Sequence, residues 1–359
     1  MRVMDLTGRE SRVDLAVSAG PAYELLITLC AFGQPGEWPT MEIGPAWFED
    51  IRRRLSADLR SGLERMGPRA GKIWVNLLGL AVQDPHAGEV QELIDRIGEL
   101  PATEVRLTLM GIHVPAYQRS VSGETLRRAG EGDPEAAVRL MADKAYWGGE
   151  AEEMLLPLLR LGVDETKALA LEVLQGWHRE VFADREGEMT PVLERDAETK
   201  RAQLATMSPE ALIETASGIQ YIPDASISQV FLIPQLTMRP WVMLCEHDDT
   251  RLFCYPVADE SIGGDATAPP GGMVRFHKAL GDEKRLRMLK FLATETATLQ
   301  DLADRFGLPK STAHHHLAIL RAAGLVRVTS DYDRTYSVRR DVLPEAARLI
   351  EAYLEGGRQ

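Results

Sequence analysis

Apolar residues recur at intervals of three and four along most of the chain before residue 219, and this spacing predicts a mainly helical region. One such pattern begins at Pro21 and runs to residue 31, and longer ones cover residues 45–66 and 163–182. Two further helices are expected to begin at Pro134 and Pro209, because each proline follows a polar capping residue and precedes a glutamate.

The pattern changes between residues 219 and 257. Short runs rich in β-branched and aromatic residues occur there, at 230–233, 241–245 and 252–255. His247, Asp248, Asp249 and Thr250 separate the last two runs and predict a hairpin turn. The region 1–257 is therefore expected to be a helical domain that closes with a small antiparallel sheet, with its β-hairpin in 219–257.

Residues 258–272, ADESIGGDATAPPGG, have the composition of a linker, because they contain almost no large apolar side chain. Helical patterns resume in 273–280 and 286–292. Thr298 is expected to cap a third helix, with Asp301 three residues later near the free amides, and Gly307 is expected to end it.

A fourth helix is expected after Pro309 and is expected to end at Gly324, which suits a left-handed cap. Two strands follow in 325–329 and 335–339, joined by an Asp-Tyr-Asp-Arg tip. Helix, turn, helix and β-hairpin in this order predict a winged helix-turn-helix over 273–359. The expected fold class is thus mainly α with a small β component (α+β).

Composition narrows the class of protein. Apolar residues make up 45% of the chain and charged residues 26%, which is typical of a globular protein. No run approaches the ~18 apolar residues that a membrane helix needs, and the first residues lack an apolar signal region. Three cysteines cannot form a disulfide framework in a chain of this length. We expect a cytoplasmic protein with no membrane partner.

Charge is distributed unevenly along the chain. The net charge is −13, yet residues 271–340 carry 13 basic side chains against 7 acidic ones. A compact basic region therefore follows an acidic one, and the local potential decides which partners bind.

This basic segment resembles the ArsR family of bacterial winged-helix transcription regulators. The resemblance is carried by ALGDEKRLRML at 279–289, TLQDLA at 298–303 and GLPKSTAHHHLAILRAAGLV at 307–326. It covers about the last 85 residues and implies binding to double-stranded DNA. The expected function is that of a sequence-specific regulator, a repressor whose DNA binding an unknown small ligand controls through the N-terminal domain.

The physical pattern of the fourth helix agrees with DNA recognition. Ala313, Leu317 and Leu320 form its inward stripe, so the polar residues of its first turns face outward. The lysine suits a phosphate, and the hydroxyl and imidazole groups suit base edges. The residues expected to contact DNA are Thr298, Gln300, Lys310, Ser311, Thr312, His314, His315, Arg321, Tyr332 and Arg334. The alternative is that these residues form the solvated face of a winged helix that binds another protein.

Two groups of residues have side chains that can bind metal ions. Three successive histidines, 314–316, point about 100° apart on a helix and cannot converge on one ion. Relatives that sense arsenicals or zinc use cysteines on the helix that begins at 299, or Asp and His on the last helix, and neither set is present here. Cys245, His247 and Cys254 flank one hairpin and would suit zinc; the alternative is two ordinary buried cysteines and a turn histidine.

No cofactor is expected, and the chain is not expected to be an enzyme. It lacks a Ser-His-Asp order, a phosphate-binding loop, a dinucleotide glycine motif and His-Glu-x-x-His. The tryptophans of the helical region are most simply core residues. If some line a cavity, they suit an apolar or aromatic effector. The rival hypotheses are an N-terminal domain that serves only as an oligomerisation or docking platform, and an enzyme with a DNA-binding appendage.

An apolar stripe on the last helix predicts a homodimer. The stripe recurs every three or four residues from Val342 to Leu354 and needs a partner. The expected dimer interface comprises Met273, Phe276, Leu349, Ile350 and Tyr353. A two-fold axis through it would place two recognition helices ~34 Å apart on a near-palindromic operator. The competing interpretation is that the stripe packs onto the N-terminal domain of its own chain.

Overall fold

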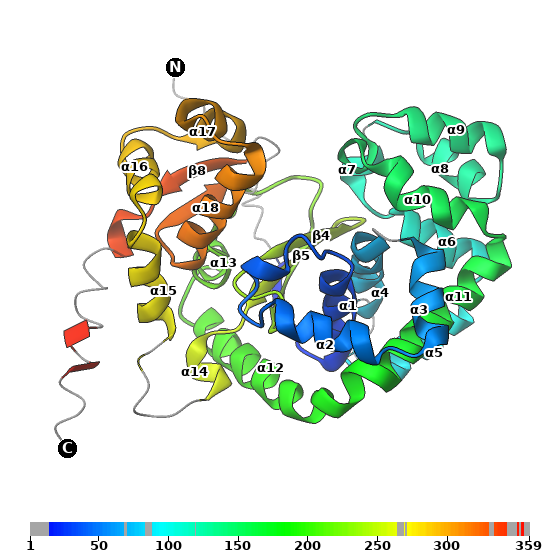
Figure 1. Cartoon of the computed structure of the whole chain (residues 1–359), viewed down its shortest axis with the longest axis horizontal. Coiled ribbons are helices and arrows are strands. Elements are labelled where there is room, and N and C mark those ends of the chain that lie inside the picture. The colour runs from blue at the N-terminus through cyan, green and yellow to red at the C-terminus, as the bar shows by residue number, and fades with distance from the viewer. Residues whose placement is uncertain are drawn as a thin grey trace, which may run out of the picture.

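The structure, a computed structural model, describes residues 14–67, 70–82, 88–118, 120–263, 269, 271–329, 334–342, 350–351 and 353–354. Figure 1 shows helices α3 and α5–α11 at one end, the C-terminal helices α15–α18 at the other, and strands β4 and β5 between them. The long helix α12 (Ala183–Leu204) runs along one side and links the two ends.

The N-terminal part is built around α1 (Pro21–Phe32), in which every residue from Pro21 to Ala31 is buried. The other helices of this part are α2 (Pro45–Arg54), α3 (Ala57–Met66), α4 (Leu78–Val82), α5 (Val90–Glu99), α6 (Ala102–Met110), α7 (Pro115–Gln118), α8 (Gly123–Gly130), α9 (Pro134–Ala142), α10 (Ala151–Arg160) and α11 (Val163–Trp177). Short turns of 3-10 helix lie at η1 (Trp38–Thr40), η2 (Ala70–Leu77) and η3 (Tyr146–Gly149), and a π-helical turn lies at η4 (His178–Phe182).

The predicted helix starts are confirmed where a side chain caps the helix. The Asp133 carboxylate accepts hydrogen bonds from the amides of Glu135 and Ala136 at the start of α9. Ser208 does the same for α13 (Pro209–Ser217) through the amide of Ala211. The single pattern over 45–66 is instead two helices, because Leu55 is not helical and Ser56 caps a new helix.

The first sheet has the strand order β1-β3-β5-β4. Its strands are β1 (Asp14–Val17), β3 (Gln229–Gln235), β4 (Met243–His247) and β5 (Thr250–Pro256). The hairpin β4–β5 turns at Asp248 and Asp249 as predicted, and its strands are antiparallel. The expectation of an antiparallel sheet is wrong for the rest, because β3 pairs in parallel with both β1 and β5. Strand β3 is buried along most of its length, as is usual for parallel strands.

The C-terminal part is the predicted winged helix-turn-helix. Its helices are α15 (Gly271–Leu280), α16 (Glu283–Leu292), α17 (Leu299–Phe306) and α18 (Lys310–Ala322). Strands β6 (Ala297–Thr298), β7 (Val326–Thr329) and β8 (Thr335–Val338) form the wing sheet, and η5 (Arg340–Val342) follows. Gly307 and Gly324 have φ values of 59° and 70°, which a residue with a side chain rarely adopts. The fold class, mainly α with a small β component, is confirmed.

The two parts share a hydrophobic core. Strand β2 (Ile219–Gln220) pairs in parallel with β7 and so extends the wing sheet. Leu212 and Phe253 from the N-terminal part belong to the same core cluster as Leu302 and Leu317. The division at 257/273 remains a prediction, but any separation of the two parts must expose part of this core.

The expected linker begins with a docked helix, α14 (Asp259–Ile262). The buried carboxylate of Asp196 on α12 accepts hydrogen bonds from the Ala258 amide, at 2.7 Å, and the Ser261 hydroxyl, at 2.9 Å. Residues 264–268 and 270 of the linker lie outside the described residues. Within the described part of the chain, no helix is long and apolar enough to cross a membrane.

Candidate nucleic-acid interface

Helix α18 presents the predicted polar residues at its N-terminal end. Lys310, Ser311 and His315 are exposed, and Thr312 is half-buried. Ala313, Leu317 and Leu320 are buried against the core, as the spacing predicts. The amides of the first turn of α18 have no acceptor within the helix and no side-chain cap, so this end of the helix suits a phosphate.

The other residues predicted to contact DNA have varied surroundings. The Thr298 hydroxyl donates to Asp301 at 2.7 Å and caps α17, so this side chain has a structural role. Gln300 is exposed and its amide donates to Asp304. Arg334 is exposed beside the wing, whereas Tyr332 lies outside the described residues.

One side of α18 faces the N-terminal part rather than solvent. The His314 ring lies 5.1 Å from the Trp241 ring, and the Arg321 guanidinium lies 5.9 Å from the same ring. Ala318, on the same side of the helix, is only 8% exposed although it is outside the inward stripe. Of the predicted DNA contacts, His314 and Arg321 are therefore partly covered by the protein itself.

Trp241 is held firmly in this position. Its indole N–H donates to the Thr40 hydroxyl at 2.7 Å, and its carbonyl accepts from the Gln235 side chain at 2.8 Å. Burial beside this ring lowers the pKa of His314; Glu37 raises it, and Arg321 lowers it further. His314 is consequently neutral at pH 7 in this arrangement. The contact of Trp241 with α18 was not predicted from the sequence, in which Trp241 is only a large aromatic residue just before a short strand.

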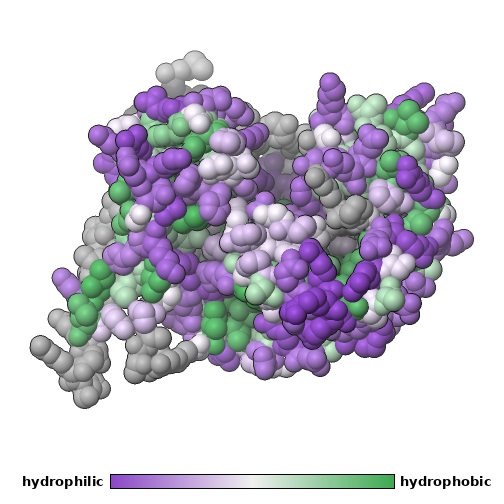
Figure 2. Space-filling view, viewed as in Figure 1, coloured by the Kyte–Doolittle hydropathy of each residue, from purple (hydrophilic) through white to green (hydrophobic). Residues whose placement is uncertain are grey.

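A cavity of about 1040 Å³ lies beside this contact. Its wall includes His314 and Arg334 from the winged helix and Gln34, Tyr117 and Trp241 from the N-terminal part. In the space-filling view the surface is hollowed between the two ends of the molecule (Figure 2). Residues predicted to read DNA thus form part of the wall of a ligand-sized space.

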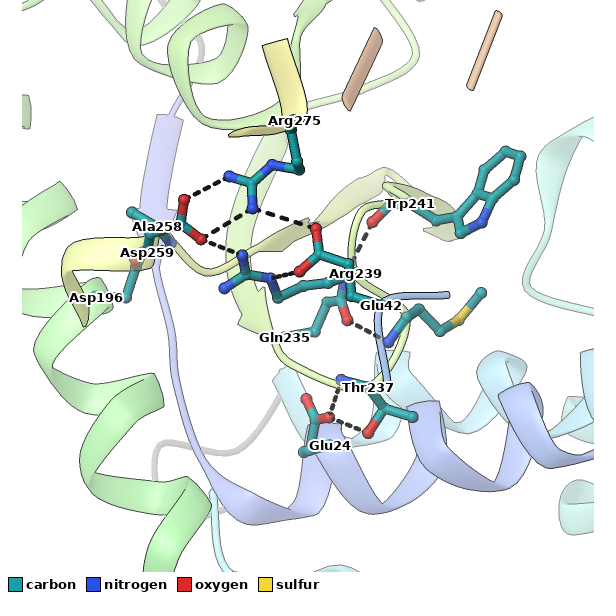
Figure 3. A network of polar contacts seen from close by, with 11 residues as sticks. Glu24, Glu42, Asp196, Gln235, Thr237, Arg239, Trp241, Ala258, Asp259 and Arg275 are labelled. Carbon is teal, nitrogen blue, oxygen red and sulfur yellow. Dashed lines mark hydrogen bonds and ion pairs between the residues drawn. The ribbon is translucent and has the colours of Figure 1, made fainter. Parts of the chain in front are cut away.

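An ionic cluster joins the first helix of the winged domain to the N-terminal part (Figure 3). The Arg239 side chain, 5% exposed, pairs with Glu42 at 3.0 Å and with Asp259. Arg275 on α15 pairs with the same two carboxylates, at 3.3 Å and 2.7 Å. Two guanidinium groups share two carboxylates, and the cluster thereby fixes α14 and α15 against the strand-to-strand loop that carries Arg239.

The Cys245, His247 and Cys254 candidate does not assemble into one site. The register pairs Cys245 with Leu252 and Cys254 with Met243, so the cysteines lie diagonally rather than opposite each other. Contact with Cys245 and burial raise the pKa of Cys254, which keeps its thiol protonated. Among the described residues, the donor atoms close enough to share an ion belong to His113, His247 and Asp248.

His247 makes the stability of the protein sensitive to acid. Burial, and next the neighbouring His113, lower the pKa of His247 to about 4. The rings of these histidines stack at 4.2 Å. As the pH falls below 6.5 the unfolded chain binds a proton that the folded chain does not, so stability is lost with acid. From pH 7 to pH 5 we expect His247 to lower the free energy of unfolding by about 2 kcal/mol.

Urea unfolding at both pH values tests this expectation. The His247→Gln variant should lose less stability between pH 7 and pH 5 than the wild type. His277→Gln, which changes an exposed histidine, should behave like the wild type. Equal losses for all three proteins would contradict the assignment to His247.

The residues predicted to form a dimer interface are only partly available. Phe276 is 8% exposed and lies in the core of its own chain. Met273 and Ile350 are half-buried, Tyr353 is 37% exposed, and Leu349 lies outside the described residues. Residues 343–349 and 352 of the expected last helix lie outside the described residues, and Leu354 near its end is 69% exposed. The homodimer stays a prediction, and Phe276 is the predicted interface residue least available to a partner.

The C-terminal part is similar to known proteins. Residues 280–329 match a family model described as a helix-turn-helix domain. A solved structure, that of NolR from Sinorhizobium fredii, aligns with 32% identity over 23% of this chain and 85% of the NolR chain, with a TM-score of 0.20. No curated protein matches the chain. The C-terminal part is a helix-turn-helix domain, which places the chain among DNA-binding regulators.

Proposed function

We propose that this protein is a sequence-specific transcription regulator of the ArsR type that represses as a homodimer. The observation that carries the proposal is the N-terminal end of α18, where Lys310, Ser311 and His315 are exposed on a winged helix-turn-helix. The local excess of basic residues over 271–340 supports a polyanionic partner.

We further propose that a small ligand controls DNA binding through the N-terminal part. The cavity of about 1040 Å³, which opens to solvent, favours a sensor over a pure oligomerisation platform, because a platform has no need of a ligand-sized space. A catalytic role for the N-terminal part has no support from its motifs, so we do not propose an enzyme.

The test begins with selection of duplexes from a random pool by the full-length protein. Lys310→Ala should weaken binding to selected and random duplexes alike and lower the salt slope by ~0.9, because one phosphate contact is lost. His315→Ala should cost about 1–3 kcal/mol on the selected duplex and little on random ones, because base contacts carry the discrimination.

Lys290→Ala is the matched control, since Lys290 is an exposed lysine on α16 outside the predicted contacts. It should leave both the affinity and the salt slope unchanged. Failure to select any duplex, or identical losses for Lys310→Ala and Lys290→Ala, would refute DNA recognition by α18.

A further inference from the structure

We propose that the cavity between α18 and the N-terminal part binds an uncharged aromatic molecule, and that this molecule holds His314 and Arg334, two of the predicted DNA contacts, away from DNA. The ligand site does not depend on the proposed regulator function. The effect of the ligand on DNA binding rests on that function.

The charges of the cavity wall favour an uncharged ligand. The wall contains three acidic and three basic side chains: Glu37, Asp224, Glu246, Lys72, Arg251 and Arg334. Lys72 is already paired with Glu150 at 2.8 Å, and Arg251 with Glu246 at 2.7 Å. A charged ligand would give up its hydration without gaining a surplus of opposite charge, and burial of a charge under those conditions is costly.

The shape and chemistry of the wall favour a flat, aromatic ligand. Tyr117 and Trp147 pack together with their ring centroids 4.9 Å apart, and Trp241 packs on His314. Both pairs line the same space, together with apolar side chains that include Met41, Val75, Val114, Met238, Val242 and Met243. Two aromatic pairs in the wall of a largely apolar space suit stacking with a planar molecule. The side-chain nitrogens of Gln34 and Asn76 already donate within the protein, and their side-chain oxygens can accept hydrogen bonds from a ligand.

The position of the cavity links the ligand to DNA. His314 and Arg334 line it, and both are predicted DNA contacts. A molecule that touches these residues and the Tyr117 side at once stabilises the arrangement in which the two sides face each other. DNA needs the same residues of the winged domain turned toward its grooves. The two ligands therefore oppose each other, and by linkage each lowers the affinity of the other.

The probes for the site are 1-N-phenylnaphthylamine, which is uncharged, and its sulfonated relative 8-anilinonaphthalene-1-sulfonate. Fluorescence titration of the full-length protein should show saturable binding of the uncharged probe. The double variant Ala116→Trp, Ala225→Trp fills the cavity from two exposed positions in its wall and should weaken that binding at least tenfold. The double variant Ala57→Trp, Ala202→Trp, at exposed helical positions outside the cavity, should bind like the wild type.

Circular dichroism and thermal unfolding establish that each variant is folded. If the double cavity variant does not fold, the single substitution Ala116→Trp or Ala225→Trp is used in its place. Equal binding to the cavity and control variants would overturn the site. Tighter binding of the sulfonate, abolished by the cavity variant, would overturn the uncharged class of ligand.

The regulatory half is tested on a duplex selected by the protein. Saturation with the uncharged probe should lower the affinity for that duplex at least tenfold in the wild type and leave the cavity variant unaffected. Unchanged or higher affinity in the wild type would overturn the opposition between ligand and DNA. If no duplex is selected, the regulator function fails, while the fluorescence titration still decides whether the cavity is a site.

Discussion

Replacement of Asp259 by alanine is expected to lower the free energy of unfolding by about 3 kcal/mol. The carboxylate bridges Arg239 and Arg275 (Figure 3). The Arg239 side chain is only 5% exposed. Without Asp259 the two guanidinium groups keep Glu42 as their common carboxylate. The buried charge of Arg239 therefore loses one of its two carboxylate partners. Such a truncation costs more than the pair contributes, because the remaining charge is left desolvated.

The effect of Asp259→Ala should depend on pH in a defined direction. Burial by itself would raise the pKa of Asp259, but Arg275 and Arg239 lower it below its usual value. A carboxyl group with a lowered pKa contributes stability above its unfolded-state pKa and loses it as the pH falls through the folded-state pKa. The difference between wild type and variant should therefore be full at pH 7 and shrink below pH 4.

Urea unfolding measures this difference, with Glu198→Ala as the control. Glu198 is an exposed carboxylate on the neighbouring helix α12, and its loss should change stability by less than about 0.5 kcal/mol. A cost for Asp259→Ala as small as that of the control would show that the cluster does not hold α14 and α15 in place.

The winged helix-turn-helix could be predicted from the sequence because its signals are local. Thr298 and Asp301 lie three residues apart and complete a reciprocal cap, and Gly307 and Gly324 provide the left-handed residues after α17 and α18. Each of these features depends on a few adjacent residues, so the pattern fixes the elements without knowledge of the rest of the chain.

The first sheet and the covered side of α18 could not be predicted in the same way. Strand β1 pairs with β3 more than 200 residues later, and the polarity pattern of a strand carries no information about the direction of a distant partner. The contact between Trp241 and His314 likewise joins two segments that are remote in sequence. The exposed residues of α18 were therefore predictable as candidates for DNA contact, whereas the partial burial of His314 and Arg321 was not.

Strand register decides whether Cys245, His247 and Cys254 can bind one metal ion. The sequence predicted the hairpin, and its two-residue turn is where the pattern placed it. The pairing, however, places Cys245 opposite Leu252, and His247 stacks on His113 from the loop after α6. The sequence pattern places the three residues on one hairpin. It does not predict the contact of His247 with His113, because His113 lies in a loop between two helices far away in the sequence.

Substitution of Leu349 and Tyr353 by glutamate is expected to convert the proposed homodimer to a monomer. The sequence predicts an apolar stripe from Val342 to Leu354, and the described Tyr353 and Leu354 are 37% and 69% exposed. Burial of such a stripe against a second copy would stabilise the proposed dimer, and carboxylates at positions 349 and 353 would oppose that contact. Sedimentation should show the monomer, and loss of the second half-site contact should lower operator affinity between about 100- and 10,000-fold.

Val138→Glu is the matched control for this expectation. Val138 is 69% exposed on α9 in the N-terminal part, so its replacement adds a carboxylate to an equally exposed apolar position without touching the last helix. This variant should remain a dimer and keep its operator affinity. If the Leu349→Glu, Tyr353→Glu protein sediments as a dimer with unchanged affinity, the last helix is not the interface. The burial of Phe276 in its own chain then favours the N-terminal part as the dimerisation surface.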